Sequence, residues 1–119
     1  MIRHMLRAKI HRATVTGADL NYEGSITIDE TLMEKAGLLP YEKVDILNLS
    51  NGIRAETYVI KGKKDSGEII MNGAIARLVQ IGDQIIILSY TEMEEEHALT
   101  FEPIIIIVDE KNRIVRSLP

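Results

Sequence analysis

The sequence predicts a mainly β fold: a small closed barrel of six to seven short strands with one or two short helices. Runs in which apolar and polar residues alternate recur along the chain, as is typical of strands that bury one face. Turn residues separate these runs at short intervals, and few segments carry helix signals. Many short strands within 119 residues favour a barrel over a sandwich of long strands.

The first third of the chain predicts two strands and a helix. Alternating residues place strands over 8–16 and 25–30. We expect a short helix over 30–36, because Asp29 can cap its start and Gly37 can adopt the left-handed conformation that ends a helix.

The middle of the chain predicts a β-hairpin. Two alternating runs within residues 43–62 flank Asn51-Gly52, a dipeptide that tolerates the positive φ angles of a type I′ turn. A charged loop over 61–68 follows the hairpin.

The remaining elements follow at short intervals. The order expected from the sequence is a strand at 69–73, helical turns at 73–80, a buried strand at 82–90, an acidic link at 91–99 that is helical or frayed, and two strands within 102–118 around Asp109–Asn112.

Composition indicates one domain, residues 1–119, with a modest aliphatic core. The net charge of −4 argues against nucleic acid or an anionic membrane as the main partner. The absence of cysteine excludes disulfides and thiolate ligands. The longest apolar runs, 85–88 and 104–108, are too short to span a bilayer, and the N-terminus has no signal-peptide core, so we expect a cytoplasmic protein.

Common catalytic motifs are missing from the sequence. The three histidines are scattered without the spacing of metal ligands, so we expect no metal. Neither a glycine-rich phosphate loop nor G-x-S-x-G occurs, so nothing supports a nucleotide, pyridoxal phosphate or a common hydrolase.

Gly24-Ser25 opens the strand "SITIDE", and taken alone it indicates only a turn. Arg54, Thr57 and Tyr58 taken alone are ordinary residues of an antiparallel strand. Local sequence therefore identifies no reactive residue.

The order of several motifs changes that interpretation. The segments are "KIHRATVT", "YEGSITIDE", "EKAG", "NGIRAETYVIKG", "NGAIARL" and "GDQIIILSY". In this order and spacing, the chain resembles the pyruvoyl-dependent aspartate 1-decarboxylase family over about residues 1–90, and more loosely to its end. The resemblance implies a double-psi β-barrel.

The resemblance also implies an activity and a cofactor. The Gly24–Ser25 bond would cleave itself into chains 1–24 and 25–119, and Ser25 would become a covalently bound pyruvoyl group. L-aspartate would form a Schiff base with this group and lose CO₂ to give β-alanine, which supplies pantothenate and coenzyme A synthesis. Neither a metal nor pyridoxal phosphate is expected.

Residue roles follow from matching positions in the family. Tyr58 matches the proton donor, and Thr57 matches a residue that polarises the scissile carbonyl and later contacts the substrate. Other substrate contacts are implied at Gly73, Ala74 and Ile75, with supporting donors at His11, Tyr22 and Asn72. The family has alanine where this chain has Ile75, whose side chain either crowds the pocket or faces the core or a neighbouring subunit.

Charge considerations suggest how aspartate would be held. A cation beside the departing α-carboxylate would stabilise the ground state, whereas the β-carboxylate keeps its charge throughout. We therefore hypothesise that Arg54 binds the β-carboxylate, assisted by Lys9. Leu47, Ile60 and Ile86 could form apolar walls near the leaving group.

The resemblance further implies a homotetramer with active sites between subunits, and some members need a maturation factor for self-cleavage. Two alternatives remain open at this point. One is a barrel without enzymatic activity that binds a partner. The other is an enzyme with an external cofactor such as pyridoxal phosphate.

Overall fold

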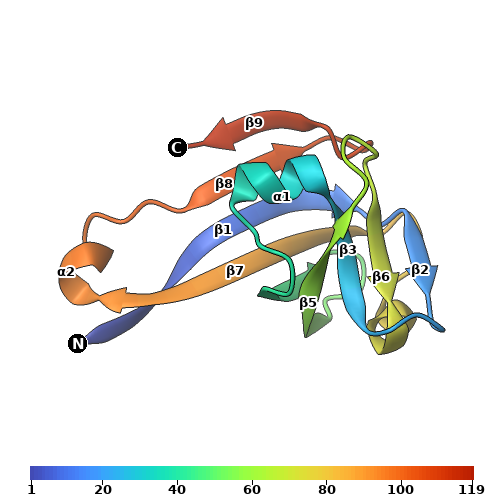
Figure 1. The fold of residues 1–119 in the computed structure, drawn as a ribbon, viewed down its shortest axis with the longest axis horizontal. Coiled ribbons are helices and arrows are strands. Elements are labelled where there is room, and N and C mark those ends of the chain that lie inside the picture. Colours follow the sequence, from blue (N-terminus) through green and yellow to red (C-terminus); the bar gives the residue numbers. More distant parts are fainter.

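Nine strands form one mixed sheet in the computed structural model, which describes residues 1–119 (Figure 1). The strands are β1 (Ile2–Thr14), β2 (Gly17–Asp19), β3 (Ser25–Asp29), β4 (Lys43–Asn48), β5 (Arg54–Gly62), β6 (Ile69–Asn72), β7 (Gln84–Glu94), β8 (Ile104–Val108) and β9 (Ile114–Leu118). The helices are α1 (Glu30–Ala36), the 3₁₀ helix η1 (Gly73–Leu78) and α2 (Glu95–Ala98). The predicted mainly β fold is confirmed.

The strands pair in the order β2-β6-β3-β5-β4-β7-β1-β8-β9. Three pairs are parallel, namely β1 with β8, β2 with β6, and β3 with β5. Each parallel pair joins segments far apart in the sequence, as parallel pairing requires. The pairing order ends at β2 and β9, so closure of the barrel stays a prediction.

The sheet has more strands than the six to seven predicted. The short strand β2 was not predicted, because three residues carry no recognisable alternation. Strand β1 begins at Ile2 rather than at residue 8, and β7 continues to Glu94, which pairs with Ile2. Figure 1 shows these two strands running side by side out to α2. The expected acidic link is therefore strand up to Glu94, and only then helix.

The hairpin over residues 43–62 is confirmed, but the type I′ turn is wrong. Strands β4 and β5 pair antiparallel, with Leu47 opposite Arg54. Gly52 has φ of 75°, whereas Asn51 does not adopt a positive φ. The Asn51 amide instead donates to the Leu78 carbonyl at 3.0 Å and accepts from the Ile53 N–H at 3.0 Å. These contacts hold Asn51 in a longer loop.

Helix α1 is confirmed over residues 30–36. Asp29 accepts a hydrogen bond from the Thr31 N–H at 2.8 Å, and Gly37 is left-handed with φ of 72°. The Asp29 carboxylate also accepts from the Asp65 and Gly67 N–H groups at 2.9 and 2.8 Å. It therefore joins the end of β3 to the charged loop as well as to the helix.

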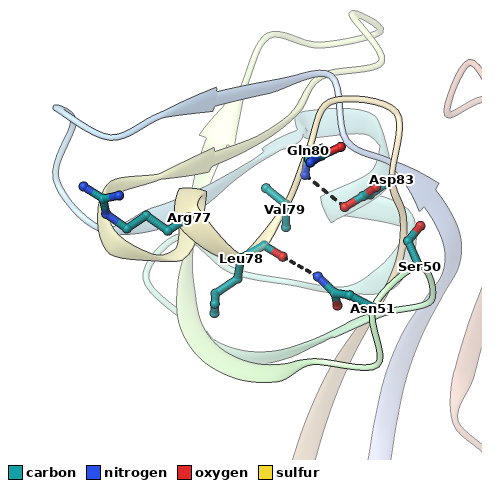
Figure 2. A pocket seen from close by; sticks show the side chains of 7 residues that line it. All are labelled: Ser50, Asn51, Arg77, Leu78, Val79, Gln80 and Asp83. Carbon is teal, nitrogen blue, oxygen red and sulfur yellow. Dashed lines mark hydrogen bonds between the residues drawn. The ribbon is translucent and has the colours of Figure 1, made fainter.

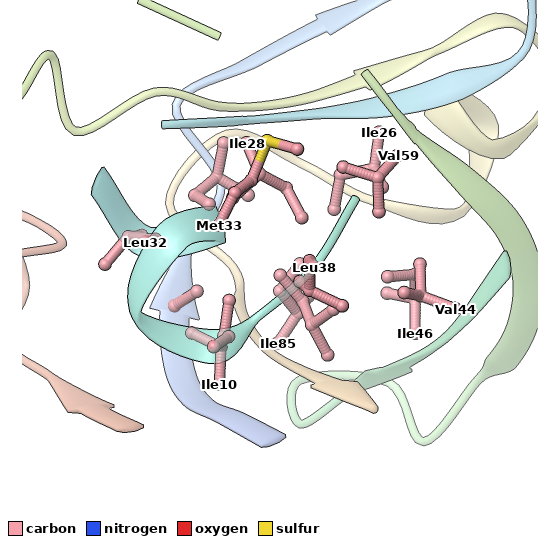
Figure 3. Packing of buried hydrophobic residues seen from close by; sticks show 14 of the residues in the cluster. Ile10, Ile26, Ile28, Leu32, Met33, Leu38, Val44, Ile46, Val59 and Ile85 are labelled. Carbon is pink, nitrogen blue, oxygen red and sulfur yellow. The ribbon is translucent and has the colours of Figure 1, made fainter. Parts of the chain in front are cut away.

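A cluster of 21 buried apolar residues lies between α1 and the sheet, and Figure 3 shows part of it. Its largest fully buried side chains include Ile10, Ile26, Ile28, Ile85 and Ile87. Ile75, which is 8% exposed, belongs to the same cluster. Of the two orientations considered for Ile75, the structure has the side chain facing the core.

No helix is long and apolar enough to cross a membrane.

Asn112 offers a test of how the loops are held together. Its backbone is left-handed, with φ of 61°, and its buried amide donates to the Thr14 and Gly67 carbonyls and accepts from the Thr14 N–H. We expect Asn112→Ala to lower the free energy of unfolding by about 3 kcal/mol, because it leaves these buried groups unpaired. Chemical denaturation measures this loss.

Asn112→Gly is the matched control. It removes the same amide but tolerates the left-handed backbone, so it should lose about 1 kcal/mol less than Asn112→Ala. A change below about 0.5 kcal/mol in Asn112→Ala, the level expected at ordinary surface sites, would contradict the assigned role.

Candidate active site around Ser25

Ser25 begins strand β3 and is completely buried. It pairs with Asn72 on β6. The Asn72 amide donates to Ser25 Oγ and to Thr27 Oγ1, both at 2.9 Å, and Ser25 Oγ donates to the Glu23 carbonyl at 3.3 Å. The hydroxyl is therefore held between the Asn72 amide and the Glu23 carbonyl.

The backbone of residues 22–24 packs directly against Gly73. A Cβ on Gly73 would lie 2.7 Å from Gly24 Cα, 2.9 Å from Gly24 N and 3.1 Å from the Tyr22 carbonyl oxygen. Gly73 also has φ of 70°, so both its backbone and its surroundings favour glycine. A Cβ on Gly24, in contrast, would meet no atom within 4 Å, so crowding does not explain that glycine.

Tyr58 lies level with Ser25 on the neighbouring strand. Strands β3 and β5 are parallel with Ile26 opposite Val59, and both of these side chains are buried. One residue earlier on each strand, Ser25 and Tyr58 therefore share the opposite face. Thr57 points away from Tyr58, because successive side chains of a strand alternate.

Arg54 lies on the same face as Tyr58, but about 13 Å further along β5. Its Nη1 pairs with Asp45 Oδ2 at 3.1 Å, and the guanidinium side chain is 55% exposed. Together with Leu47 and Ile86, it lines a pocket of about 270 Å³. Two of the three predicted apolar walls are thus beside Arg54, whereas Ile60 does not line this pocket.

Lys9 and His11 lie on β1, three strands from β5 in the sheet order. His11 Nδ1 is buried without a hydrogen-bond partner. Burial lowers the pKa of His11 below its usual value, and the charges of Lys9 and Arg12 lower it further. His11 is therefore disposed to be neutral, and the chain does not place it beside Ser25.

The chain has three pockets, and none of them contains Ser25. Figure 2 shows a pocket of about 280 Å³. Among its lining residues, the Asn51 side-chain amide donates to the Leu78 carbonyl, and the Gln80 N–H donates to the Asp83 carboxylate. The largest, of about 350 Å³, lies between His4, Tyr90, the start of β4 and Glu56 of β5. Ser25 is covered rather than open to a cavity within one chain.

The single chain thus gathers only some of the predicted site residues. Gly24, Ser25, Asn72 and Gly73 are together, with Tyr58 on the adjacent strand. Lys9, His11, Arg54 and Thr57 lie elsewhere or face away. The Tyr22 side chain is exposed, and only its carbonyl approaches Gly73; Ala74 is exposed as well.

Two groups at the Ser25 site were not predicted from the sequence. Thr27 shares the Asn72 amide, and the Glu23 carbonyl accepts from the hydroxyl. Thr27 could have been found, because it is two residues from Ser25 and so lies on the same face of the strand. Glu23 acts through its backbone, which its residue type does not reveal.

No group of three or more His, Cys, Asp or Glu side chains is placed to hold a metal ion.

A family model described as aspartate decarboxylase matches residues 1–115 of the chain. The chain belongs to the aspartate decarboxylase family. Aspartate 1-decarboxylase of Clostridium botulinum is 59% identical over 114 residues, which are 96% of this chain and 92% of that protein. Aspartate 1-decarboxylase of Lactiplantibacillus plantarum is 55% identical over 118 residues, 99% of this chain and 91% of that protein.

One solved structure, of a rationally designed protein, aligns with a TM-score of 0.48 and 12% identity over 66% of this chain and 91% of its own. The double-psi arrangement therefore remains an expectation from the family resemblance.

The residues around Ser25 fit the pyruvoyl group that this family implies. Such a group must arise from a serine whose hydroxyl reaches the carbonyl of the preceding residue. Here the hydroxyl is buried, Asn72 fixes its oxygen, and the preceding residue is Gly24. In the structure described, residue 25 is serine.

The contact between Gly73 and Gly24 can be tested by stability. We expect Gly73→Ala to be more destabilising than Gly52→Ala. Both positions are left-handed and share a backbone penalty of about 1–2 kcal/mol. A Cβ at position 73 would also clash with backbone atoms, which costs about 1–3 kcal/mol more. A Cβ at position 52 would meet no atom within 4 Å.

Urea denaturation of both variants measures the difference. Each variant also carries Ser25→Ala, so that every sample keeps one uncut chain. Equal losses in the two variants would contradict the tight packing of Gly73 on Gly24.

Proposed function

We propose that this chain is a pyruvoyl-dependent aspartate 1-decarboxylase that makes its cofactor from Ser25 and converts L-aspartate to β-alanine and CO₂. The observation that carries the proposal is the buried Ser25 hydroxyl, which directly follows Gly24 and is held by hydrogen bonds to Asn72 and to the Glu23 carbonyl, in a chain of the aspartate decarboxylase family. In the cytoplasm, β-alanine then supplies pantothenate synthesis.

Cofactor formation begins with an attack by Ser25 Oγ on the Gly24 carbonyl carbon. The C–N bond breaks, and an ester and a free α-amine replace the amide. Loss of the Ser25 Cα proton then expels the Gly24 carboxylate and leaves dehydroalanine at residue 25. Water adds and ammonia leaves, which gives the ketone of a pyruvoyl group. Chains 1–24 and 25–119 are the products.

The surrounding residues suit the first of these steps. The Asn72 N–H fixes the attacking oxygen, and the Glu23 carbonyl accepts its proton in a hydrogen bond. Gly73 keeps residues 22–24 in place by close packing. Thr57 matches the family's donor to the scissile carbonyl, a role typically worth about 3–4 kcal/mol in related acyl chemistry, but within one chain it faces away from Ser25.

When formed, the pyruvoyl ketone supplies an electron sink for the electrons left at Cα as CO₂ departs. The chain's own residues bind aspartate and deliver a proton. Tyr58 donates the proton to Cα, which suits a phenol because it is neutral at pH 7. Backbone groups of residues 73–75 contact the substrate. The Ile75 side chain faces the core, so its bulk does not lie between these groups and a substrate.

Arg54 binds the β-carboxylate of aspartate in this proposal, with Lys9 assisting. The β-carboxylate keeps its charge throughout, so a tight bidentate contact does not oppose the loss of CO₂. Leu47 and Ile86 beside Arg54 provide the apolar walls. Aspartate would replace Asp45, another carboxylate, as the partner of the guanidinium.

The active sites lie between copies of the chain in a homotetramer. Support for this comes from the separation within one chain of Ser25 from the Arg54 pocket and from Lys9. A neighbouring copy would bring a second set of these residues over the covered Ser25.

Intact-mass analysis under denaturing conditions tests the self-cleavage. We expect masses for residues 1–24 and 25–119, the larger fragment lacking a free N-terminal amine. Borohydride with aspartate should add mass to the larger fragment. Ser25→Ala, the matched control, should stay a single chain. A wild-type chain that remains uncut after prolonged incubation and releases no CO₂ from aspartate would refute the proposal.

Arg54→Lys tests the assignment of the β-carboxylate. The variant keeps the positive charge but loses the bidentate fork, so we expect aspartate turnover to fall at least about tenfold, the effect of about 1.4 kcal/mol. Self-cleavage should proceed at the wild-type rate. Equal damage to both reactions would contradict the role of Arg54.

Mixing then tests whether a site uses two copies. Refolding Ser25→Ala chains together with Arg54→Lys chains should restore part of the activity, because some sites then combine an intact Ser25 with an intact Arg54. No recovery would place both residues of a site on one copy.

A further inference from the structure

Tyr41 has an unusual backbone for a bulky residue. Its φ is 72°, in the left-handed region that glycine and asparagine tolerate more easily than tyrosine. The residue is 78% exposed, so burial of its ring does not compensate for this conformation. A strained residue of this kind is a candidate for a functional role.

The ring of Tyr41 contacts Tyr58. The ring centroids are 6.4 Å apart and the planes are inclined by 34°. This separation lies within the range of about 4.5–7 Å over which aromatic rings attract one another. Tyr58 itself is 36% exposed.

Two backbone hydrogen bonds hold Tyr41 against β5. The Tyr41 N–H donates to the Val59 carbonyl at 2.7 Å, and the Val59 N–H donates to the Glu42 carbonyl at 3.0 Å. Val59 follows Tyr58 directly, so the strained residue is attached to the strand next to the tyrosine that its ring contacts.

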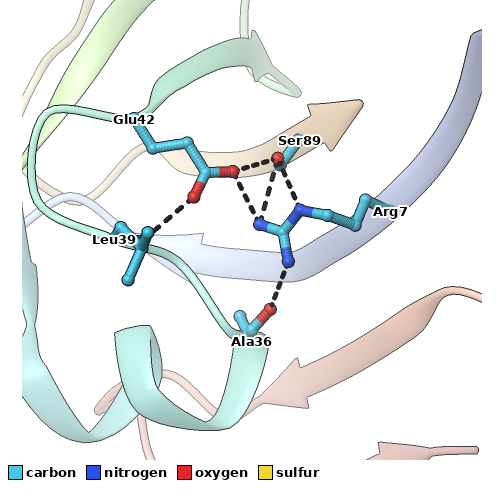
Figure 4. A network of polar contacts seen from close by, with 5 residues as sticks. All are labelled: Arg7, Ala36, Leu39, Glu42 and Ser89. Atoms are coloured by element: carbon cyan, nitrogen blue, oxygen red, sulfur yellow. Dashed lines mark hydrogen bonds and ion pairs between the residues drawn. The ribbon is translucent and has the colours of Figure 1, made fainter. Parts of the chain in front are cut away.

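The side chain of Glu42 secures the same loop, as Figure 4 shows. Its carboxylate accepts from the Leu39 N–H at 3.0 Å, from Arg7 Nη2 at 2.7 Å and from Ser89 Oγ at 2.5 Å. Arg7 in turn donates to the Ala36 carbonyl at the end of α1. Residues from β1, β7 and α1 thus hold the loop that carries Tyr41.

Glu42 is ionised in this network. Burial raises the pKa of its carboxyl, but hydrogen bonds from Ser89, the Leu39 N–H and Arg7, together with the charge of Arg7, outweigh burial and lower it.

We propose that Tyr41 is a positioning residue for Tyr58, and that its ring restricts the phenol to the direction in which it donates a proton to the substrate. The inference rests on the proposed function, since Tyr58 is the proton donor only there. Tyr41 itself does not touch the reacting atoms. The Arg7–Glu42–Ser89 network fixes the Tyr41 backbone, so the ring contact has a defined geometry.

Tyr41→Asn and Tyr41→Phe form a matched pair. Asparagine suits the left-handed backbone but removes the ring, whereas phenylalanine keeps the ring and the strain. In Tyr41→Asn we expect kcat to fall about tenfold, a part of the roughly 10²–10⁴-fold that a placed proton donor supplies. KM and self-cleavage should match the wild type, the thermal midpoint should not fall below that of the wild type, and Tyr41→Phe should behave as wild type throughout.

The configuration of the product gives a more direct readout. In D₂O, the carbon that loses CO₂ acquires one deuterium, and a fixed donor delivers it to one face. We expect a single configuration from the wild type and Tyr41→Phe, and a mixture from Tyr41→Asn. A loss of general stability would not scramble this configuration.

A second readout needs no cofactor. In uncut Ser25→Ala protein carrying ¹³C-labelled tyrosine, the Tyr58 signal is identified by its loss in Tyr58→Phe. We expect Tyr41→Asn to move this signal toward that of free tyrosine, and Tyr41→Phe to leave it in place.

Three results would overturn the inference. The first is a wild-type rate and product configuration in Tyr41→Asn, and the second is an equal loss of kcat in Tyr41→Phe. The third is a loss of kcat in Tyr41→Asn that is accompanied by impaired self-cleavage or a lower thermal midpoint. Failure of the wild-type chain to decarboxylate aspartate is a different result. That result would refute the proposed function, whereas an unchanged Tyr58 signal in Tyr41→Asn would refute only the positioning role of Tyr41.

Discussion

Strand β3 lies between β5 and β6, and the candidate site depends on these two pairings. The antiparallel pairing with β6 brings Asn72 opposite Ser25, and it starts η1 at Gly73 beside Gly24. The parallel pairing with β5 puts Tyr58 level with Ser25 on the same face. A slip of one residue in either pairing would turn Ser25 toward the core. Ile26 and Ile28 oppose such a slip, because their burial against the core fixes which face each side chain takes.

Burial of Ser25 is compatible with a reaction that happens once in each chain. A buried hydroxyl without partners would be costly, but Asn72 and the Glu23 carbonyl satisfy it. The hydroxyl and the carbonyl that it would attack belong to neighbouring residues, so the reaction is intramolecular, and the same bonds restrict the orientation of the hydroxyl. Entry of a substrate is unnecessary at that stage, since the bond that breaks belongs to the chain.

Local signals predicted local structure well. Asp29 and Gly37 defined α1 at both ends, and alternation identified the hairpin. Strand β1 was predicted too short, because its first six residues pair with an equally polar part of β7 and bury no continuous face. At the site, the role of Ser25 followed only from the order of distant motifs. Thr27 was detectable from its spacing to Ser25. The contact of Tyr41 with Tyr58 was not, because it depends on a loop held by Arg7 and Ser89 from other strands.

The two proposed reactions make different demands on the chain. Self-cleavage draws on contacts among residues 22–25, 72 and 73, most of which are complete within one copy. Aspartate binding also needs a cation, and Arg54 lies about 13 Å along β5 from the position of Tyr58, where its guanidinium is already paired with Asp45. A strand is too stiff to close that distance. In the proposed homotetramer another copy would supply the cation, so that maturation would depend mainly on the fold of each chain and substrate recognition on assembly.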